Sequence, residues 1–522
     1  MRRERTKVLN NQTTPNASGK AIVYWMQRDV RTVDNWALLY ANWLAELHHV
    51  PLQVMYCLHP PPTEELESAL LPKIILETKM THRHGSFMLG GLKCVHADLK
   101  ARNIPLHVLM PSSPATVGHA VLQLFNTVQP AMVICDFSPL RQYRDWMEHQ
   151  TAPKLQHIPM IQVDAHNVVP VWHASPKREV GARTLRPKLH KLVGTFLTDF
   201  PPVVSDSAAS HNLALPITCP DFDLETYISY LDMDMSVPPV PWAKPGTEYA
   251  MTQFETFTKN GLPQFDQLRN NPNLPQICSN LSPWINHGHV SFQRLAILVK
   301  KLNKYANGTA SYIEEGMVRR ELSDNFVYYA PTNYDDLTAA ADWAQQTLEQ
   351  HATDPREWLY STKELTDAQT HDGLWNAAQL QLTTQGTMHG FLRMYWAKKI
   401  LEWTASPVIA LRTAQYLNDK YALDGNDPNG FVGVAWSIMG IHDMGWKERE
   451  IFGKIRYMNY AGCQRKFKVD EFVEKYSPAG KNAIIAAKKL GREAEGTKKA
   501  KSVGNKTRDA TTAAASKRRK VT

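Results

Sequence analysis

The chain has 522 residues, of which 43% are hydrophobic, and it carries a formal net charge of +9. This length exceeds one ordinary domain, so we expect two or three. No apolar run approaches the ~20 residues of a membrane span, and the basic N-terminus lacks the apolar segment of a secretory signal. These features argue against a membrane-embedded or secreted class and predict no membrane partner.

Six scattered cysteines form no CxxC pair, which predicts reduced thiols in a cytosolic or nuclear protein and no metal site. The charge is unevenly distributed. Residues 476–522 hold thirteen Lys and Arg against three acids, a net charge of +10, so the remaining chain sums to about −1. Any DNA affinity of the folded body must therefore come from a local basic patch.

Residues 1–20 are polar and basic, and we expect them to form a disordered arm. From 21 to 200, buried-strand patterns alternate with helical ones, which predicts a doubly wound parallel α/β domain. The strand patterns lie at 21–27, 51–58, 105–110, 131–136 and 159–166. No GxGxxG follows the first strand, so this domain either binds an accessory chromophore or is purely structural, and we assign no site there.

Eight prolines in 201–245 predict a linker over the surface, with one short helix in DLETYISYLDMD. From 246 to 475 long helical periodicities recur, which predicts an all-α domain. They lie at 247–260, 289–305, 311–322, 337–351, 374–382, 388–404 and 406–420. The tail, 476–522, is of low complexity and is expected to be disordered. It ends in the basic cluster Lys517–Lys520, which indicates either a nuclear import signal, the interpretation we favour, or a solvated tail that binds polyanions weakly.

Three groups of side chains in the helical region can carry chemistry. Ser279-Asn280-Leu281-Ser282 precedes a helix and suits either a phosphate or an ordinary helix N-cap. Trp396 and Trp403 are seven residues apart, about two helical turns, and Trp375 on the preceding helix could pack between them. Such tryptophans suit either an electron relay or a Trp-rich core.

Arg393 is flanked by apolar residues, so it needs a carboxylate, and Asp424 in the loop LDGNDPNG is the candidate partner. Trp436 follows this loop and could stack on a planar ligand. Further along, basic residues alternate with Trp446, Tyr457 and Tyr460. This pattern is typical either of binding to a distorted or single-stranded nucleic-acid backbone or of a solvated helix face.

Taken together, these motifs resemble the class II cyclobutane pyrimidine dimer DNA photolyases of the photolyase/cryptochrome family. The resemblance spans almost the whole chain outside the two tails and the proline-rich segment. The matching stretches are YWMQRDVRTVDNWALLYA (24–41), SNLSPWINHGHVS (279–291), RRELSDNF (319–326), THDGLWNAAQ (370–379), MHGFLRMYWAKKILEW (388–403), LDGNDPNGFVGVAWSI (423–438) and GKIRYMNYAGCQRKF (453–467).

The resemblance implies an enzyme that repairs UV-damaged DNA with light. A reduced, anionic FAD in the helical domain would donate an electron to a flipped-out cyclobutane dimer, which must leave the base stack to be reached. The implied FAD contacts are Ser279, Leu281, Ser282, Arg393, Asn418, Asp424, Asp427 and Asn429. Among them, Arg393 and Asp424 would pair beside the flavin ring, and Asn418 would lie near its N5. An antenna chromophore, a deazaflavin or a folate, is left open.

The resemblance also implies which residues meet the DNA. Glu315 would lie beside a dimer carbonyl, and Met394 and Trp436 would form the walls that hold the dimer. Arg269, Trp446 and Arg456 would fill or brace the gap left in the duplex. Trp396, Trp375 and Trp403 would relay electrons to oxidised flavin, with Trp396 nearest to it. We expect a monomer.

Two positions depart from the pattern of related photolyases. Val318 and Arg319 stand in the turn after Glu315, where a Trp is common, and Phe265 stands where many relatives carry a Tyr near the flavin phosphates. The second change removes a hydroxyl contact worth about 1 kcal/mol. Two alternatives remain, a cryptochrome-like blue-light photoreceptor and a (6-4) photoproduct photolyase. Glu315, Asn418, Met394 and Trp436, which are all retained, together favour repair over signalling. The overall match lies outside the subgroup that repairs (6-4) photoproducts.

Overall fold

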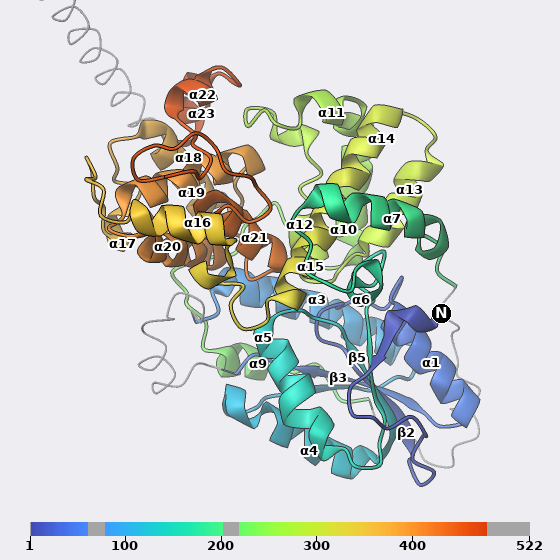
Figure 1. Cartoon of the computed structure of the whole chain (residues 1–522). Coiled ribbons are helices and arrows are strands. Elements are labelled where there is room, and N and C mark those ends of the chain that lie inside the picture. The colour runs from blue at the N-terminus through green and yellow to red at the C-terminus, as the bar shows by residue number, and fades with distance from the viewer. Residues whose placement is uncertain (1, 61–78, 202–218, 478–522) are drawn as a thin grey trace, which may run out of the picture.

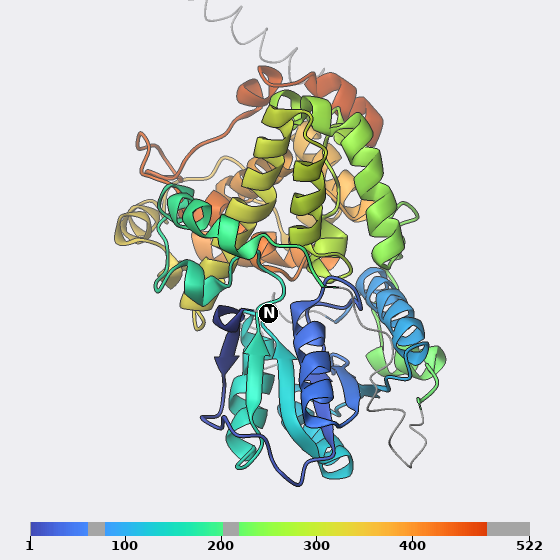
Figure 2. The same cartoon turned by 90° about the vertical axis from the view of Figure 1, so that its right-hand side faces the viewer.

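The computed structural model describes residues 2–60, 79–201 and 219–477. An α/β domain and a larger helical domain are stacked on each other, and the first residues of the chain lie at their junction (Figures 1 and 2). Both expected fold classes are confirmed. No helix in these three ranges is long and apolar enough to cross a membrane.

The α/β domain is built on a six-stranded sheet with strand order β1-β6-β5-β2-β3-β4. All neighbouring strands are parallel except β1, which pairs antiparallel with β6. The strands are β1 (Thr6–Val8), β2 (Ala21–Trp25), β3 (Leu52–Cys57), β4 (Leu106–Leu109), β5 (Pro130–Asp136) and β6 (Met160–Val163). Each of the five predicted strands is present. Every residue of β2 and β5 is buried, as expected of central strands covered on both faces.

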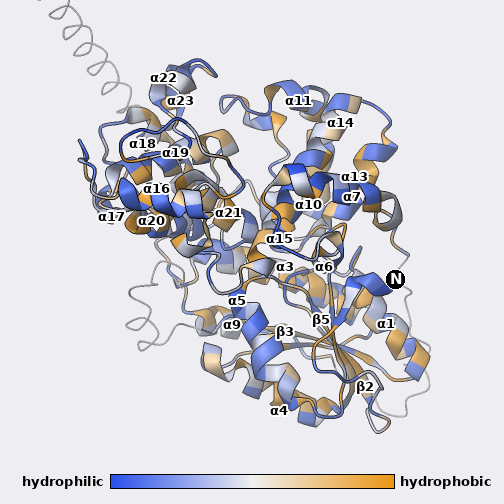
Figure 3. Cartoon of the chain, viewed as in Figure 1, coloured by the Kyte–Doolittle hydropathy of each residue, from blue (hydrophilic) through white to orange (hydrophobic). Residues whose placement is uncertain are grey.

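Helices cover both faces of the sheet, and alternate strand residues face opposite sides. Ile22 and Tyr24 pack on the side of α1 (Trp36–His48) and α3 (His82–Lys100). Val23 and Trp25 pack on the side of α4 (Val117–Val128). The hydrophobic strands therefore lie between helices whose outer faces are polar (Figure 3).

The N-terminal arm is ordered, and the expectation of disorder is wrong for its described part. A 3-10 turn at Arg3–Arg5 leads into the edge strand β1. The Arg5 side chain is 2% exposed and donates five hydrogen bonds, four to backbone carbonyls and one to Gln293 Oε1. The polar composition misled the prediction because it gave no sign that Arg5 would find these buried acceptors.

The boundary between the domains also differs from the sequence assignment. Helices α6 (Val171–Ala174) and α7 (Ala182–Phe196), which we had placed in the α/β domain, pack in a core with helical-domain residues such as Phe254 and Leu295. In the proline-rich segment, residues 202–218 lie outside the described residues. The expected short helix is α9 (Leu224–Leu231), whose Tyr227 and Leu231 join the α/β core.

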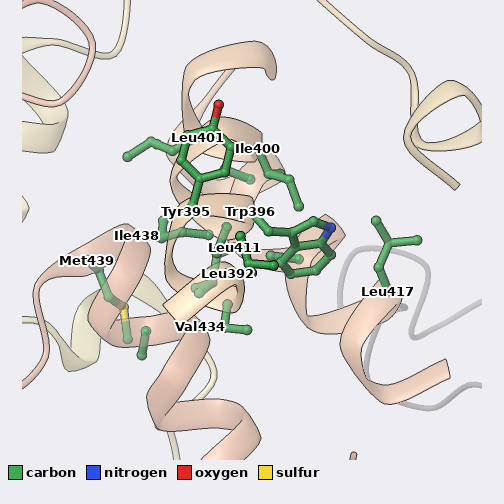
Figure 4. Packing of buried hydrophobic residues seen from close by; sticks show 14 of the residues in the cluster. Leu392, Tyr395, Trp396, Ile400, Leu401, Leu411, Leu417, Val434, Ile438 and Met439 are labelled. Atoms are coloured by element: carbon green, nitrogen blue, oxygen red, sulfur yellow. The ribbon is translucent and has the colours of Figure 1, made fainter. Parts of the chain in front are cut away.

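The helical domain matches the predicted periodicities closely. Its principal helices are α10 (Thr247–Asn260), α11 (Phe265–Leu268), α12 (Ser282–Asn286), α13 (Phe292–Lys301), α14 (Ala306–Ile313), the π-helix η7 (Glu314–Arg319), α15 (Arg320–Tyr329), α16 (Asp342–Gln350), α17 (Thr362–Thr366), α18 (Gly373–Gln385), α19 (Gly390–Trp403), α20 (Pro407–Tyr421), α21 (Pro428–Met439), α22 (Tyr460–Gln464) and α23 (Val469–Tyr476). The core around α19 is closely packed, with Trp396 on the side that faces Leu417 of α20 (Figure 4).

The turn after β2 joins the two domains. Arg28 forms a bidentate ion pair with Asp324 of α15, at 2.8 and 2.9 Å. The backbone amides of Gln27, Arg28 and Asp29 all donate to one oxygen of Asp136. A carboxylate of the protein thus occupies the cluster of amides that binds phosphate in nucleotide-binding α/β domains. The residues of this turn therefore hold the two domains together, and its three amides are bonded to Asp136.

Candidate functional site

Three of the predicted flavin contacts converge in the helical domain. Arg393 of α19 pairs with Asp424 in the loop after α20, at 2.7 Å, and its other nitrogen donates to Asn418 Oδ1 at 3.3 Å. Burial acts to raise the pKa of Asp424, but the Arg393 guanidinium outweighs it and holds this pKa below its ordinary value. The carboxylate is therefore charged at neutral pH and fixes the Arg393 side chain.

Asn418 is positioned by a residue that the sequence analysis missed. The amide of Asn418 donates to Asp419 Oδ1 at 3.0 Å, and Asp419 also accepts from Gln415 and from the backbone of Asn426. Asp419 is 2% exposed, and burial raises its pKa. This network sets the orientation of the Asn418 amide. Asp419 gave no signal in the sequence because it has the pattern of an ordinary polar position of α20, and its bond from Asn426 depends on the path of the following loop.

The loop is held against both ends of the short helix α12 (Ser282–Asn286). Asn286 donates to the Gly425 carbonyl at 2.8 Å, and Ser282 contributes a hydrogen bond that lowers the pKa of Asp424, after the larger effect of Arg393. Leu281, expected with Ser282 among the flavin contacts, is fully buried. Residues from α12, α19, α20 and the loop thus meet at one place, as expected.

Asp427 and Asn429 have a structural role in this arrangement. Asp427 caps α21 by accepting from the Gly430 amide at 2.5 Å, and Asn429 donates to its other oxygen at 3.1 Å. Burial, followed by the charge of Asp424, raises the pKa of Asp427 to about 7. The two side chains hold the end of the loop, and their expected contact with a flavin stays a prediction.

The residues present fit a flavin with its phosphate chain. Phe265, the departure noted above, is 6% exposed and packs against Tyr312 of α14, with ring centroids 5.9 Å apart. The Tyr312 hydroxyl, beside Ser279, is buried and makes no hydrogen bond of good geometry within the described residues. Arg393, Asn418 and Asp424 supply the polar groups that a flavin ring requires.

The three predicted relay tryptophans are in contact. Trp375 of α18 stacks on Trp396, with centroids 6.2 Å apart and planes 6° from parallel. It meets Trp403 edge-on at 5.9 Å, so it packs between the other two as expected. Trp396 donates to Gln379 Oε1 and Trp375 donates to the Trp396 carbonyl, which fixes both rings. All three are at most 2% exposed.

Glu315 lies on the π-helix η7, a type of helix that is frequent at functional sites. Its carboxylate pairs with Arg269 at 3.0 Å, and both side chains are about one third exposed. Arg269 is tied to the start of α19, because His389 Nε2 is 2.8 Å from its carbonyl. Val318 is fully buried and Arg319 half-exposed, so no aromatic ring follows Glu315 in this turn.

Trp436 of α21 lies between two cations. The ammonium of Lys398 is 4.8 Å from the centre of its ring, and the Arg456 guanidinium is 5.3 Å away. Arg456 also covers Trp446 at 4.1 Å and pairs with Asp443 at 2.8 Å. The predicted DNA-facing residues Trp436, Trp446 and Arg456 are therefore one cluster. Lys398, which the sequence analysis missed, is fully buried beneath it.

Two glycines leave open space beside the expected dimer walls. Gly433 lies one turn before Trp436, and Gly390 lies one turn before Met394. A Cβ atom at either glycine would meet nothing within 4 Å. Helical side chains lean toward the N-terminus, over the preceding turn. The helix surface one turn before Met394 and one turn before Trp436 is therefore open.

No group of three or more His, Cys, Asp or Glu side chains within the described ranges could hold a metal ion, and the six cysteines form no disulfide.

Comparison with known proteins identifies the family. A family model described as DNA photolyase matches residues 22–205. The deoxyribodipyrimidine photo-lyase of Potorous tridactylus is 47% identical over 478 residues, which is 91% of this chain and 85% of the relative. Those of Oryza sativa subsp. japonica and Arabidopsis thaliana are 42% and 40% identical, and cover 87% and 91% of this chain and of their own lengths.

Solved structures agree on the fold. A class III photolyase from Agrobacterium tumefaciens superposes with a TM-score of 0.61 at 17% identity, covering 89% of this chain and 87% of its own. A cryptochrome from Synechocystis superposes with a TM-score of 0.62 at 13% identity, covering 90% and 88%. The extent and identity of the sequence matches show that this chain belongs to the DNA photolyase family, among the deoxyribodipyrimidine photo-lyases.

Proposed function

We propose that this protein is a class II photolyase that repairs cyclobutane pyrimidine dimers in DNA, using light absorbed by FAD. The family implies a flavin chromophore. One observation supports the proposal most directly. Successive residues of an α-helix point about 100° apart, and α19 uses this to present Arg393 to the polar cluster, Trp396 to the tryptophan stack and Met394 in a third direction. A single rigid helix thus fixes cofactor, substrate and relay residues relative to one another.

A bound reduced FAD supplies the light-excited electron that opens the cyclobutane ring of the dimer. The residues of the chain bind and orient. Arg393 and Asp424 would bind the flavin ring, and the Asn418 amide, oriented by Asp419, would favour its reduced, anionic form. Trp436 and Met394 hold the flipped-out dimer. The Glu315–Arg269 pair offers polar groups to the dimer carbonyls, where negative charge develops.

The test is light-dependent repair by the anaerobically reduced protein. DNA with defined cyclobutane dimers is mixed with it, and the recovery of base absorbance is followed under near-UV light and in the dark. Recovery only in the light is expected. No recovery by a protein that retains photoreducible FAD would favour the photoreceptor alternative. Repair of (6-4) photoproducts instead would identify the other photolyase class.

Glu315→Gln provides a matched variant, because it keeps the size of the side chain and removes its charge. It is expected to retain FAD and to bind dimer-containing DNA, but to lower the repair yield severalfold. The Glu314→Gln variant on the same turn is the control. Glu314 pairs with Arg186 at 2.6 Å, away from Arg269, so its loss should leave the repair yield unchanged.

Three further properties are part of this proposal. Lys517–Lys520, outside the described residues, would direct nuclear import, and deleting it from a fluorescent fusion should abolish nuclear accumulation. Any antenna chromophore, a deazaflavin or a folate, would bind away from the turn after β2, whose amides Asp136 occupies; the absorption spectrum of the purified protein tests for one. The protein would act as a monomer, which size-exclusion chromatography tests.

A further inference from the structure

The tryptophan stack ends inside the protein, and this raises the question of where the relay reaches solvent. Trp403, the outermost of the three predicted relay residues, is only 2% exposed. A cation radical on a buried ring is poorly solvated and has no water to take its proton. The positive charge of Lys399 repels a cation on Trp403, because its ammonium lies 5.5 Å from the centre of the Trp403 ring. Trp403 is therefore an unfavourable place for a positive charge to stay.

An aromatic cluster continues from Trp403 to the surface. His371 and Tyr360 both meet Trp403 edge-on, at 5.0 and 5.6 Å. Trp358 stacks on His371 at 4.6 Å and lies parallel to Tyr360 at 6.5 Å, with planes 2° apart. Trp358 is 44% exposed. Contacts between aromatic rings thus form a continuous path from the buried Trp396 to the exposed Trp358.

The geometry points to Trp358 as the solvent-exposed terminal electron donor of the relay, a fourth tryptophan beyond Trp403. This inference rests on the proposed function, because it assigns the outer end of the relay that reduces oxidised flavin in light. One electron moves from Trp396 to the flavin. Electrons then move inward in turn from Trp375, Trp403 and Trp358, so that the positive charge moves outward.

At the surface, water and a dissolved thiol return Trp358 to its neutral, reduced form. The Trp358 cation radical releases its indole N–H proton to water, which the buried rings cannot do. A thiol in solution then gives the neutral radical one electron and one proton, and a thiyl radical forms. Tyr360 is the competing end point, since its hydroxyl lies 2.7 Å from His371 Nδ1, a nitrogen that could accept its proton. An exposed tryptophan needs no such internal acceptor.

The test compares Trp358→Phe with three matched variants. Phenylalanine keeps an aromatic ring against His371 but is not oxidised by a tryptophan radical. Trp396→Phe interrupts the relay at its inner end. Trp43→Phe changes an exposed tryptophan of α1, 52% exposed and in the α/β domain, and serves as the control. Tyr360→Phe removes only the hydroxyl of the competing end point.

Three readouts are used on the flavin-bound full chain with a thiol in solution. These are the rate of photoreduction of oxidised FAD, the lifetime of the tryptophan radical by transient absorption, and the residue that carries a spin-trap adduct by mass spectrometry. In Trp358→Phe we expect photoreduction severalfold slower, a shorter radical lifetime and no adduct at position 358. Trp43→Phe and Tyr360→Phe should match the wild type, and Trp396→Phe should lose photoreduction.

An unchanged rate and lifetime in Trp358→Phe would overturn the inference, as would an adduct on Tyr360 or a loss of photoreduction in Tyr360→Phe. Repair by chemically pre-reduced enzyme separates this result from the proposed function. All four variants should repair at the wild-type rate, because the relay is not needed once the flavin has been reduced. Failure of the pre-reduced wild type to repair would refute the proposed function and leave the photoreduction result standing.

Discussion

Replacing Lys398 by Met should stabilise the protein in acid and much less in alkali. Lys398 is fully buried, and burial lowers the pKa of its ammonium from 10.5 to about 7. Its main hydrogen bond, 2.8 Å long, goes to the Ser437 carbonyl in the last turn of α21. That carbonyl is one of the four that an α-helix leaves without a partner, so Lys398 caps the helix end.

The direction in which stability changes with pH follows from the folded and unfolded pKa values of Lys398. The unfolded chain binds the proton more tightly than the folded chain, so the stability of the wild type rises with pH between about 7 and about 10.5. The shift corresponds to a penalty of about 5 kcal/mol at about pH 6 and about 2 kcal/mol at about pH 9. Methionine removes this penalty but loses the hydrogen bond to Ser437, worth about 2 kcal/mol for a charged donor.

The assay is urea unfolding at both pH values, with the midpoint and slope compared for each protein. The stability difference between Lys398→Met and wild type should be about 3 kcal/mol more favourable at about pH 6 than at about pH 9. Lys399→Met is the control, because that neighbouring lysine pairs with Glu402 at 2.6 Å and its loss should give no such gain in acid. A difference for Lys398→Met that does not change with pH would refute the reasoning.

Three further predictions follow from the site and the arm. Gly433→Leu should fill the open space beside the dimer walls and weaken binding of dimer-containing DNA, while Gly194→Leu, on α7 and equally open, should not; equal loss in both, by competition binding, would contradict the placement. Asp424→Asn should weaken FAD retention by about thirtyfold, about 2 kcal/mol, because Arg393 loses its partner; full retention after gel filtration would argue against the flavin site. Arg5→Met should cost about 3 kcal/mol of unfolding free energy and expose the arm to proteolysis; an arm that still resists protease would show that these hydrogen bonds are dispensable.

The amino-acid sequence was sufficient to predict the elements of both domains. Buried-strand patterns and helical periodicities are local signals, since each depends on residues within one or two turns. The predicted strand 131–136 and helix 247–260 therefore agree with β5 and α10 almost residue for residue. The site residues were found because the family motifs are long and contiguous. The pair of Arg393 with Asp424 was also anticipated from charge and apolar flanks alone.

Only the tertiary structure decided the partners that lie far apart in the chain. Arg5 sits in a polar segment, yet its acceptors come from residues 164–168, 196 and 293. Lys398 and Asp419 appear as ordinary polar positions of their helices, and their burial depends on what packs above them. The same holds for Trp358, which stacks on His371, whose ring in turn meets Trp403 of α19. A sequence states which side chains are available, but desolvation and pairing across the fold determine which of them carry charge or electrons.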